Sequence, residues 1–225
     1  MVRVEARTLG QFVTDAAILD SLRGMITDIN ARATSEAKKV GKQQLQVVQC
    51  FKCDAKKACC HSIVVARLYE GIVVAAFLKE ANRDTPALRD ELRARAEAME
   101  AASPYEWRVP CVFLDGAERC TVYDARPTPC GTLYVYTPPA HCSDPSKPVQ
   151  AYIPHAEHEV ALQIEDEFRE RMSLRKKVGR RYIGVLPRMV LVALEAWDRT
   201  DFRDYLRQLE WPSDADADRW QRRAL

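Results

Sequence analysis

The chain has 225 residues, of which 47% are hydrophobic, so it is long enough to bury a core without help from cross-links. Its 34 Lys and Arg residues nearly balance its 32 Asp and Glu residues, and a formal charge of +2 argues against a nucleic-acid-binding protein. The most apolar stretch, residues 63–78, is interrupted by Arg67 and Glu70, which makes it too short and too charged to cross a membrane.

The N-terminal residues show no basic segment followed by an unbroken apolar run, so no secretory signal is expected. We therefore expect a cytoplasmic protein, because the cytoplasm keeps thiols reduced. In that compartment, eight cysteines indicate metal ligands or redox groups rather than structural disulfides.

The first segment is expected to be one helix. Thr8 and Gln11 form a candidate capping box, in which each side chain accepts from the backbone N–H of the other residue. An apolar stripe at helical spacing follows: Phe12, Ala16, Leu19, Leu22, Ile26 and Ile29. The polar residues 31–43 are predicted to form a connection to a cysteine-bearing loop at 50–60.

Two helices are predicted after this loop. The first covers residues 63–78, and the second begins at Pro86, with Thr85 as its cap, because proline is tolerated at the first helical position. The second helix has the stripe Leu88, Leu92, Ala96 and Met99, and Ser103-Pro104 is expected to end it.

Residues 110–148 differ from the rest because they contain seven prolines and few helix signals. They are expected to form irregular loops with one short β-hairpin, in which 112–114 pairs with 121–123 around a turn at Asp115-Gly116.

Helices are predicted again after Pro154. The first has the stripe Val160, Ile164, Phe168 and Met172, and a second covers residues 185–197. Thr200 is expected to cap a last helix with the apolar face Phe202, Tyr205, Leu206 and Leu209. The carboxylates Glu165, Asp166, Glu167 and Glu170 are expected on a solvated helix face.

The elements together predict a mainly α fold, in which a helical scaffold surrounds a loop-rich cysteine centre. We expect a single domain over residues 1–212, with the metal-binding centre at 50–142. The charged tail, residues 213–225, is expected to be loosely held.

All eight cysteines lie in this centre, and they form two groups. The first group is Cys50, Cys53, Cys59 and Cys60, and the second is Cys111, Cys120, Cys130 and Cys142. Cysteines that served only as small core residues would be scattered through the helices, so their confinement to loops indicates a metal site. Two cysteines separated by two residues can present both sulfurs to one metal ion, as zinc and iron–sulfur sites require.

The set of ligands stays open at this point. Cys59 and Cys60 are adjacent, so their side chains are expected to point apart and not to share one ion. Eight sulfurs would satisfy two four-cysteine centres, and His61 or His141 could replace a neighbouring thiol. Disulfides, or a redox-active pair formed by Cys50 and Cys53, are weaker alternatives.

Arg126 is a candidate for charge compensation at the centre. Four thiolates around zinc, or around an oxidised 4Fe–4S cluster, leave a net charge of about −2, which a guanidinium would offset. Pro127 and Pro129 would stiffen the loop that presents Cys130. An exposed arginine beside turn prolines is the alternative reading of the same residue.

The string CFKCDAKKACC, followed by PCVFLDGAERCTVYDARPTPCGTLY, resembles the YkgJ-like cysteine-cluster family of zinc- or iron-chelating proteins. The matching motifs, in order, are Cys59-Cys60, Cys111-Val112-Phe113-Leu114, Cys120-Thr121-Val122-Tyr123 and Arg126-Pro127-Thr128-Pro129-Cys130. The chain departs from the family pattern at Val112, where the family has proline, and at Gly131, where it often has arginine.

The resemblance implies a metal-binding protein that holds an iron–sulfur (4Fe–4S) cluster or zinc through these cysteines. The family includes the bacterial flagellin lysine N-methylases, so an S-adenosylmethionine-dependent N-methyltransferase that acts on a protein or small molecule is one alternative. A metal chaperone or interaction protein with a protein partner is another. No glycine-rich cofactor motif, P-loop or nucleophile elbow is present, and the catalytic residues, if any, stay unknown.

Overall fold

The computed structural model describes residues 7–43, 58–102, 107–142, 144, 146–147, 150–152, 155–174, 182–213 and 215–216. The described part of the chain is mainly helical, as predicted. Its α-helices are α1 (Leu9–Asp15), α2 (Ile18–Gln43), α3 (Leu68–Glu80), α4 (Pro86–Ala101), α5 (Thr128–Thr132), α6 (Pro139–Cys142), α7 (His155–Arg171), α8 (Leu186–Trp197) and α9 (Phe202–Gln208). Two 3-10 helices, η2 (Ala58–His61) and η3 (Tyr123–Ala125), and four strands, β1 (Val65–Arg67), β2 (Tyr134–Val135), β3 (Ala151–Tyr152) and β4 (Ile183–Val185), complete it.

The N-terminal segment forms two helices rather than the predicted one. The capping box is confirmed, because the Thr8 N–H donates to Gln11 Oε1 at 3.0 Å and the Gln11 N–H donates to Thr8 Oγ1 at 3.3 Å. The chain then turns at Ala17, whose φ is 52°, and α1 ends at Asp15. Ala16 is exposed at this break, so it does not belong to the apolar stripe.

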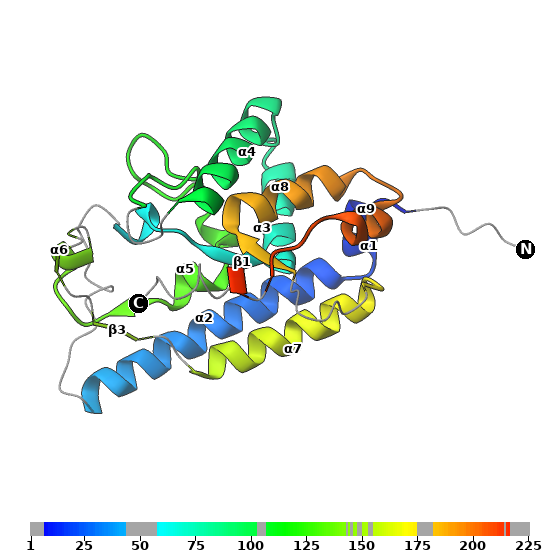
Figure 1. Ribbon diagram of the computed structural model, residues 1–225. Coiled ribbons are helices and arrows are strands. Elements are labelled where there is room, and N and C mark those ends of the chain that lie inside the picture. Colours follow the sequence, from blue (N-terminus) through cyan, green and yellow to red (C-terminus); the bar gives the residue numbers. More distant parts are fainter. Residues whose placement is uncertain are drawn as a thin grey trace, which may run out of the picture.

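The predicted connection at 31–43 is wrong, because α2 continues to Gln43. Ala33, Ala37 and Gly41 are buried and extend the stripe of Ile29 at four-residue spacing. These small residues add little hydrophobicity to the pattern, but their lack of bulk lets other elements pack closely against the helix. α2 is consequently one of the two long helices that lie side by side along the lower edge of Figure 1, the other being α7.

The centre of the core is formed by α3 and α8, which pack against each other. Each follows a buried three-residue strand, and β1 pairs with β4 in antiparallel register from Val65↔Val185 to Arg67↔Ile183. Both predicted helices therefore begin later than expected, since the β-branched residues before them extend into strands. The helices approach closely at Gly71, where an added Cβ would lie 2.5 Å from the Met189 carbonyl oxygen.

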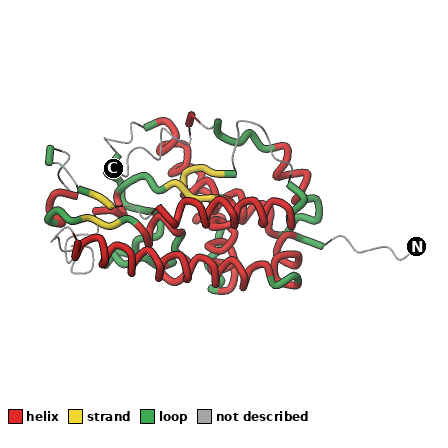
Figure 2. The backbone as a smooth tube through the Cα atoms, turned by 90° about the horizontal axis from the view of Figure 1, so that it is seen from below, coloured by secondary structure: helices red, strands yellow, loops and turns green. Residues whose placement is uncertain are grey.

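The remaining helices cover this centre. α7 packs on α2, and Ile164, Phe168 and Met172 of the predicted stripe are buried, whereas Val160 is half-buried. Figure 2 shows the strands as two separate short pairs among these helices, one of them at the left end of the view. The Thr85 cap of α4 is confirmed, because the Leu88 N–H donates to Thr85 Oγ1 at 3.2 Å. Thr200 does not cap α9, whose N-cap residue is Asp201.

The proline-rich segment contains less β structure than predicted. The expected hairpin is reduced to one antiparallel bridge between Leu114 and Cys120. The turn between them is built by Asp115, whose Oδ1 accepts from the N–H groups of Ala117 and Arg119 at 2.9 and 2.8 Å. A separate two-stranded antiparallel sheet, β2 with β3, follows later in the chain.

One of the four carboxylates predicted on a solvated helix face is instead buried. Glu165 accepts from Arg67 Nε at 3.1 Å, and the two side chains are only 8% and 9% exposed. Asp166, Glu167 and Glu170 are exposed, as predicted. None of the helices in the described ranges combines the length and apolarity that a membrane crossing requires.

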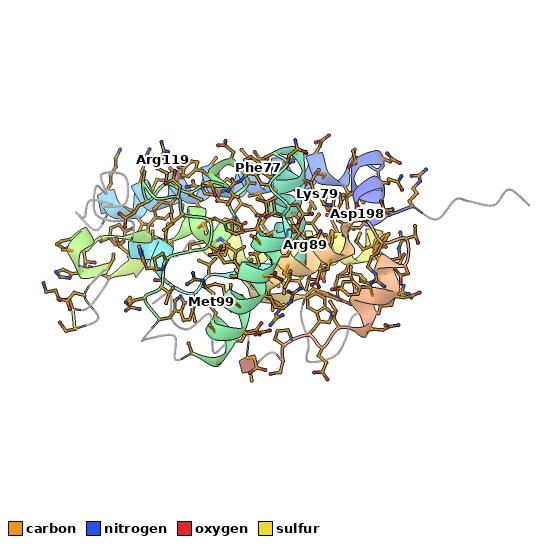
Figure 3. The ribbon with its side chains drawn as sticks, turned by 90° about the horizontal axis from the view of Figure 1, so that it is seen from above. Phe77, Lys79, Arg89, Met99, Arg119 and Asp198 are labelled. Atoms are coloured by element: carbon orange, nitrogen blue, oxygen red, sulfur yellow. The ribbon has the colours of Figure 1, made fainter. Side chains whose placement is uncertain are left out.

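The turn between α3 and α4 is held by Asp84, which is 8% exposed. Arg89 donates to both of its carboxylate oxygens at 2.7 Å, and Lys79 Nζ lies 3.0 Å from Oδ2. Lys79 also donates to Asp198 at 2.8 Å. Figure 3 labels Lys79, Arg89 and Asp198, which gather where α3, α4 and α8 meet.

Replacing Asp84 with asparagine is expected to destabilise the protein by about 1–3 kcal/mol near neutral pH, because two cations lose a charged acceptor. The pKa of Asp84 lies below its ordinary value of 3.8, first because Arg89 hydrogen-bonds its carboxylate. This stabilisation is therefore present above that value and is lost as the pH falls through the lower pKa of the folded state. Urea unfolding near neutral pH and in strong acid should show the difference between wild type and variant closing in acid.

The matched control is Asp90→Asn, since Asp90 is 76% exposed and pairs with Arg93 at the surface. An exposed pair of this kind contributes about 0–1 kcal/mol, so this variant should unfold almost like the wild type. The prediction would be contradicted if the unfolding free energies of Asp84→Asn and wild type differed as much in strong acid as near neutral pH.

Candidate metal centre

Local structure brings four cysteine-bearing segments to one end of the helical body. η2 carries Cys59 and Cys60, and the Cys111 N–H donates to the Cys60 carbonyl oxygen at 2.8 Å. The bridge between Leu114 and Cys120 then folds Cys120 back towards Cys111. α5 carries Cys130, and in Figure 1 η2, α5 and α6 lie in the left half of the molecule, away from α1 and α9.

Five of the predicted ligands are close enough to affect one another's ionisation. The thiols of Cys59, Cys111 and Cys130 each raise the pKa of Cys60, and those of Cys59, Cys111 and Cys120 each raise the pKa of Cys130. These five cysteines, which we call the thiol cluster, come from positions up to 71 residues apart in the chain (130 minus 59). The structure thus brings near one another five of the cysteines that the sequence analysis assigned to one centre.

The other three predicted ligands are less closely tied to the thiol cluster. Cys142 ends α6, which packs against η2, so it lies beside the segment that carries Cys59 and Cys60. Cys50 and Cys53 lie outside the described residues. No disulfide bond joins any two of the six described cysteines, so the disulfide alternative finds no support among them.

The vicinal pair behaves differently from the prediction. Cys59 and Cys60 were expected to point apart, but a hydrogen bond between their side chains is the first cause of the raised pKa of Cys60. Cys59 also raises the pKa of Cys130, and Cys130 raises the pKa of Cys60. The two adjacent thiols therefore lie near each other and near Cys130.

The protonation state of the cluster follows from its surroundings. Burial raises the pKa of Cys111 to about 11, and desolvation followed by the neighbouring thiols raises that of Cys130 well above its ordinary value. Cys130 still reaches solvent at the protein surface, as does Cys59. The thiols of Cys60, Cys111 and Cys130 are therefore protonated near neutral pH, and a metal that bound them as thiolates would have to displace protons.

The thiols of the cluster lie near one another, but the described ones do not surround a single metal position. Among the described residues, no group of three or more His, Cys, Asp and Glu side chains is arranged to hold a metal ion. The donor set nevertheless suits soft or borderline metals, because thiolate sulfur is the preferred ligand of zinc and of iron–sulfur clusters. The histidines have no established place in the thiol cluster. His61 ends η2 and His141 lies on α6, and the side chains of His155 and His158 lie outside the described part of the structure.

Arg126 follows η3, and its guanidinium lies 4.3 Å from the centre of the Tyr123 ring, which is 58% exposed. Its predicted role beside thiolate charge stays a prediction. A cation that sequence reasoning missed is Arg95 of α4, whose charge lowers the pKa of Cys111 against the effect of burial. Its position could not be read from the sequence, because Arg95 and Cys111 lie on different elements and only the folded chain brings them near each other.

Glu70 was also missed, because it was considered only as a charge that interrupts an apolar run. It is 0% exposed, and its two oxygens accept from different elements. Oε2 accepts from the Arg67 N–H at 2.7 Å, and Oε1 accepts from the Thr128 N–H at 2.8 Å. Glu70 therefore links the start of α3 to the start of α5, the helix of Cys130.

α5 is also fitted closely against α2. A Cβ at Gly131 would overlap with the side chain of Asn30, so a larger residue there would require Asn30 to move. The hydroxyl of Tyr134 donates to the Gly131 carbonyl oxygen at 2.9 Å and lies 2.8 Å from Thr34 Oγ1. This close approach is a physical reason for glycine where the resembling family often has arginine.

Comparison with known proteins agrees with the site. Residues 49–146 match the family model CxxCxxCC, described as "Putative zinc- or iron-chelating domain". No curated protein and no solved structure matches the chain. The matched range includes every cysteine of the chain, and the thiol cluster lies within it. Over residues 49–146 the chain is therefore similar to this cysteine-cluster family of zinc- or iron-chelating domains.

Proposed function

We propose that this chain is a metal-binding protein whose thiol cluster holds zinc or an iron–sulfur cluster. The observation that carries the proposal is the convergence of Cys59, Cys60, Cys111, Cys120 and Cys130 at one end of a helical scaffold. Cys50, Cys53 and Cys142 complete the proposed set of ligands, in agreement with the prediction from the sequence.

The number of thiols favours a centre with more than one metal atom. A structural zinc ion is saturated by four ligands, whereas five thiols already influence one another here. The fifth thiol would be accounted for by an iron–sulfur cluster with one additional thiol beside it, or by two neighbouring zinc ions. When bound, the metal would supply cross-links between segments that share few backbone hydrogen bonds, so its binding energy would contribute to folding.

The surrounding residues have separate tasks in this proposal. Arg95 and Arg126 would offset thiolate charge, and half-burial of Cys60, Cys111 and Cys120 would limit access of water to the sulfur atoms. The remaining exposure of Cys59 and Cys130 leaves one side of the cluster open to solvent.

Anaerobic purification followed by metal and sulfide analysis tests the proposal. We expect either stoichiometric iron and sulfide with broad visible absorbance, or a colourless protein with stoichiometric zinc. Removal of the metal by a chelator should lower the thermal unfolding midpoint, because the metal binds only the folded chain. Protein that contains neither metal, and binds neither when both are supplied, would contradict the proposal.

A metal chaperone is a second candidate, and the exposure of Cys59 and Cys130 is the observation that favours it. A metal that is delivered to a partner must be reachable by that partner's ligands. Rapid transfer of zinc to a competing chelator, together with fast alkylation of exposed thiols, would support this candidate over a stable centre.

The methyltransferase alternative stays a prediction that rests on the resemblance. Calorimetric titration of the metal-loaded protein with S-adenosylmethionine tests it. Binding in the micromolar range would support a methyltransferase, and no heat of binding would leave the metal-binding function standing alone.

A further inference from the structure

Glu70 joins two helices through its carboxylate. Its position is the third residue of α3, where an acidic side chain can reach back to the N–H of the residue that precedes the helix, here Arg67. The second oxygen leaves this local pattern and accepts from Thr128, which lies 58 residues further along the chain. The negative charge thereby lies in the first turn of α3, where the helix dipole stabilises it, and within hydrogen-bonding distance of the first residue of α5.

The charge of Glu70 is also balanced by the residues around it. Arg67 of β1 is buried. Burial works to lower the pKa of its guanidinium, but Tyr69, Glu70 and Glu165 outweigh that effect and raise the pKa. Glu165 of α7 binds the same guanidinium at 3.1 Å. A buried carboxylate with two N–H donors and a nearby guanidinium is satisfied without a metal, so Glu70 is not itself expected to be a ligand.

The contact to Thr128 matters because it fixes the start of α5, whereas the packing against α2 lies at Gly131, further along the helix. α5 contains five residues, which is too short to be stable alone. Pro127 and Pro129 have no N–H, so Thr128 supplies the only backbone donor of this three-residue stretch. The Cys130 N–H then donates to the Pro127 carbonyl oxygen at 3.0 Å, which closes the turn that presents the Cys130 thiol.

We propose that Glu70 is a positioning residue for the thiol cluster: by binding the Thr128 N–H it holds the start of α5 so that Cys130 faces Cys59, Cys111 and Cys120 before any metal arrives. The negative charge of Glu70 also acts on the Cys130 thiol, which shows that the two groups are close. This inference rests on the proposed metal-binding function, since positioning has a measurable consequence only if the cluster binds metal.

The test replaces Glu70 with glutamine, which keeps the size of the side chain. One of the two backbone N–H groups then faces an amide NH2, which cannot accept its hydrogen bond. The metal-free protein would be titrated with Co(II), whose charge-transfer absorbance reports thiolate binding, and reconstituted in parallel with ferrous iron and sulfide. For whichever centre the wild type forms, Glu70→Gln is expected to weaken binding about 10–100-fold, as loss of residues that orient ligands typically does. The absorbance spectrum should also change, because the Cys130 thiol would no longer be held in one orientation.

The matched control is Glu195→Gln on α8. Glu195 accepts from Arg93 at 3.0 Å and from the Tyr205 hydroxyl at 2.7 Å, so its loss also removes charged hydrogen bonds from the fold. The control should bind metal with the wild-type affinity and spectrum even if its unfolding free energy falls as much as that of Glu70→Gln. Equal metal binding and spectra in both variants would overturn the inference while leaving the metal-binding function intact.

A second measurement needs no substitution and therefore decides the matter if Glu70→Gln does not fold. Hydrogen exchange of the Thr128 amide in metal-free wild type should be slowed, since Glu70 holds it without the metal. Exchange as fast as that of an exposed amide, with protection appearing only after metal is added, would overturn the inference. A wild type that binds neither Co(II) nor an iron–sulfur cluster would instead overturn the proposed function, and the inference with it.

Discussion

Replacement of Cys130 by serine is expected to lower the affinity of the protein for its metal by more than about 100-fold, because loss of a residue that only orients a ligand already costs about 10–100-fold. Cys130 is the thiol that Cys59, Cys111 and Cys120 all influence, so it lies centrally in the thiol cluster. Serine has nearly the same shape, but its hydroxyl is a poor ligand for metals that prefer sulfur. Titration of the metal-free variant with zinc against a competing chelator measures the change.

The control for Cys130→Ser is Thr132→Ser on the same helix. Thr132 is buried, and its hydroxyl donates to the Thr128 carbonyl oxygen at 2.9 Å, a bond that serine can keep. This variant should bind metal like the wild type, although it loses a methyl group from the packing of α5. Wild-type affinity in Cys130→Ser would show that Cys130 is not a ligand and would move the proposed centre towards Cys59, Cys60 and Cys111.

Arg67→Met is expected to destabilise the metal-free protein by about 3–5 kcal/mol, the usual cost of removing one partner of a buried ion pair. Methionine fills much of the volume of the arginine stem, but it leaves the carboxylate of Glu165 buried without its cation. Glu70 loses the same compensating charge, although its two backbone hydrogen bonds remain available. Urea unfolding near neutral pH, monitored by the helical signal, measures the loss.

The double variant Arg67→Met with Glu165→Leu separates charge from packing. A buried ion pair replaced by well-packed apolar side chains is often neutral or stabilising, so the second substitution should restore most of the lost stability. Two losses that simply add would contradict the prediction, because residues in direct contact are expected to couple.

The sites of these two substitutions, Cys130 and Arg67, are connected through the fold. Arg67 lies at the end of β1, which pairs with β4 in the centre of the fold, and its partner Glu165 lies on α7. Glu70, in the first turn of α3, then connects this buried charge network to Thr128 at the start of α5, the helix that carries Cys130. The scaffold and the thiol cluster are therefore joined by specific contacts rather than by apolar packing alone.

Local patterns in the sequence determined the parts of this protein that depend on neighbouring residues. The capping box at Thr8 and the cap at Thr85 were predictable because their partners lie three residues away. The buried residues Ile164, Phe168 and Met172 followed from four-residue spacing, and the confinement of all eight cysteines to 50–142 predicted a metal-chelating segment there. The mainly α fold and the match to a zinc- or iron-chelating domain agree with these predictions.

Only the tertiary structure decided which charged residues are buried and which thiols meet. The partner of Arg67 lies 98 residues away, so spacing along α7 could not distinguish Glu165 from its exposed neighbours. Residues 31–43 looked like a connection because alanine and glycine carry little hydrophobicity, yet they are helical, and Ala33 and Ala37 are buried where other elements cover them. Burial and ion pairing depend on which surfaces come together in space, whereas sequence patterns record only which residues are near one another along the chain.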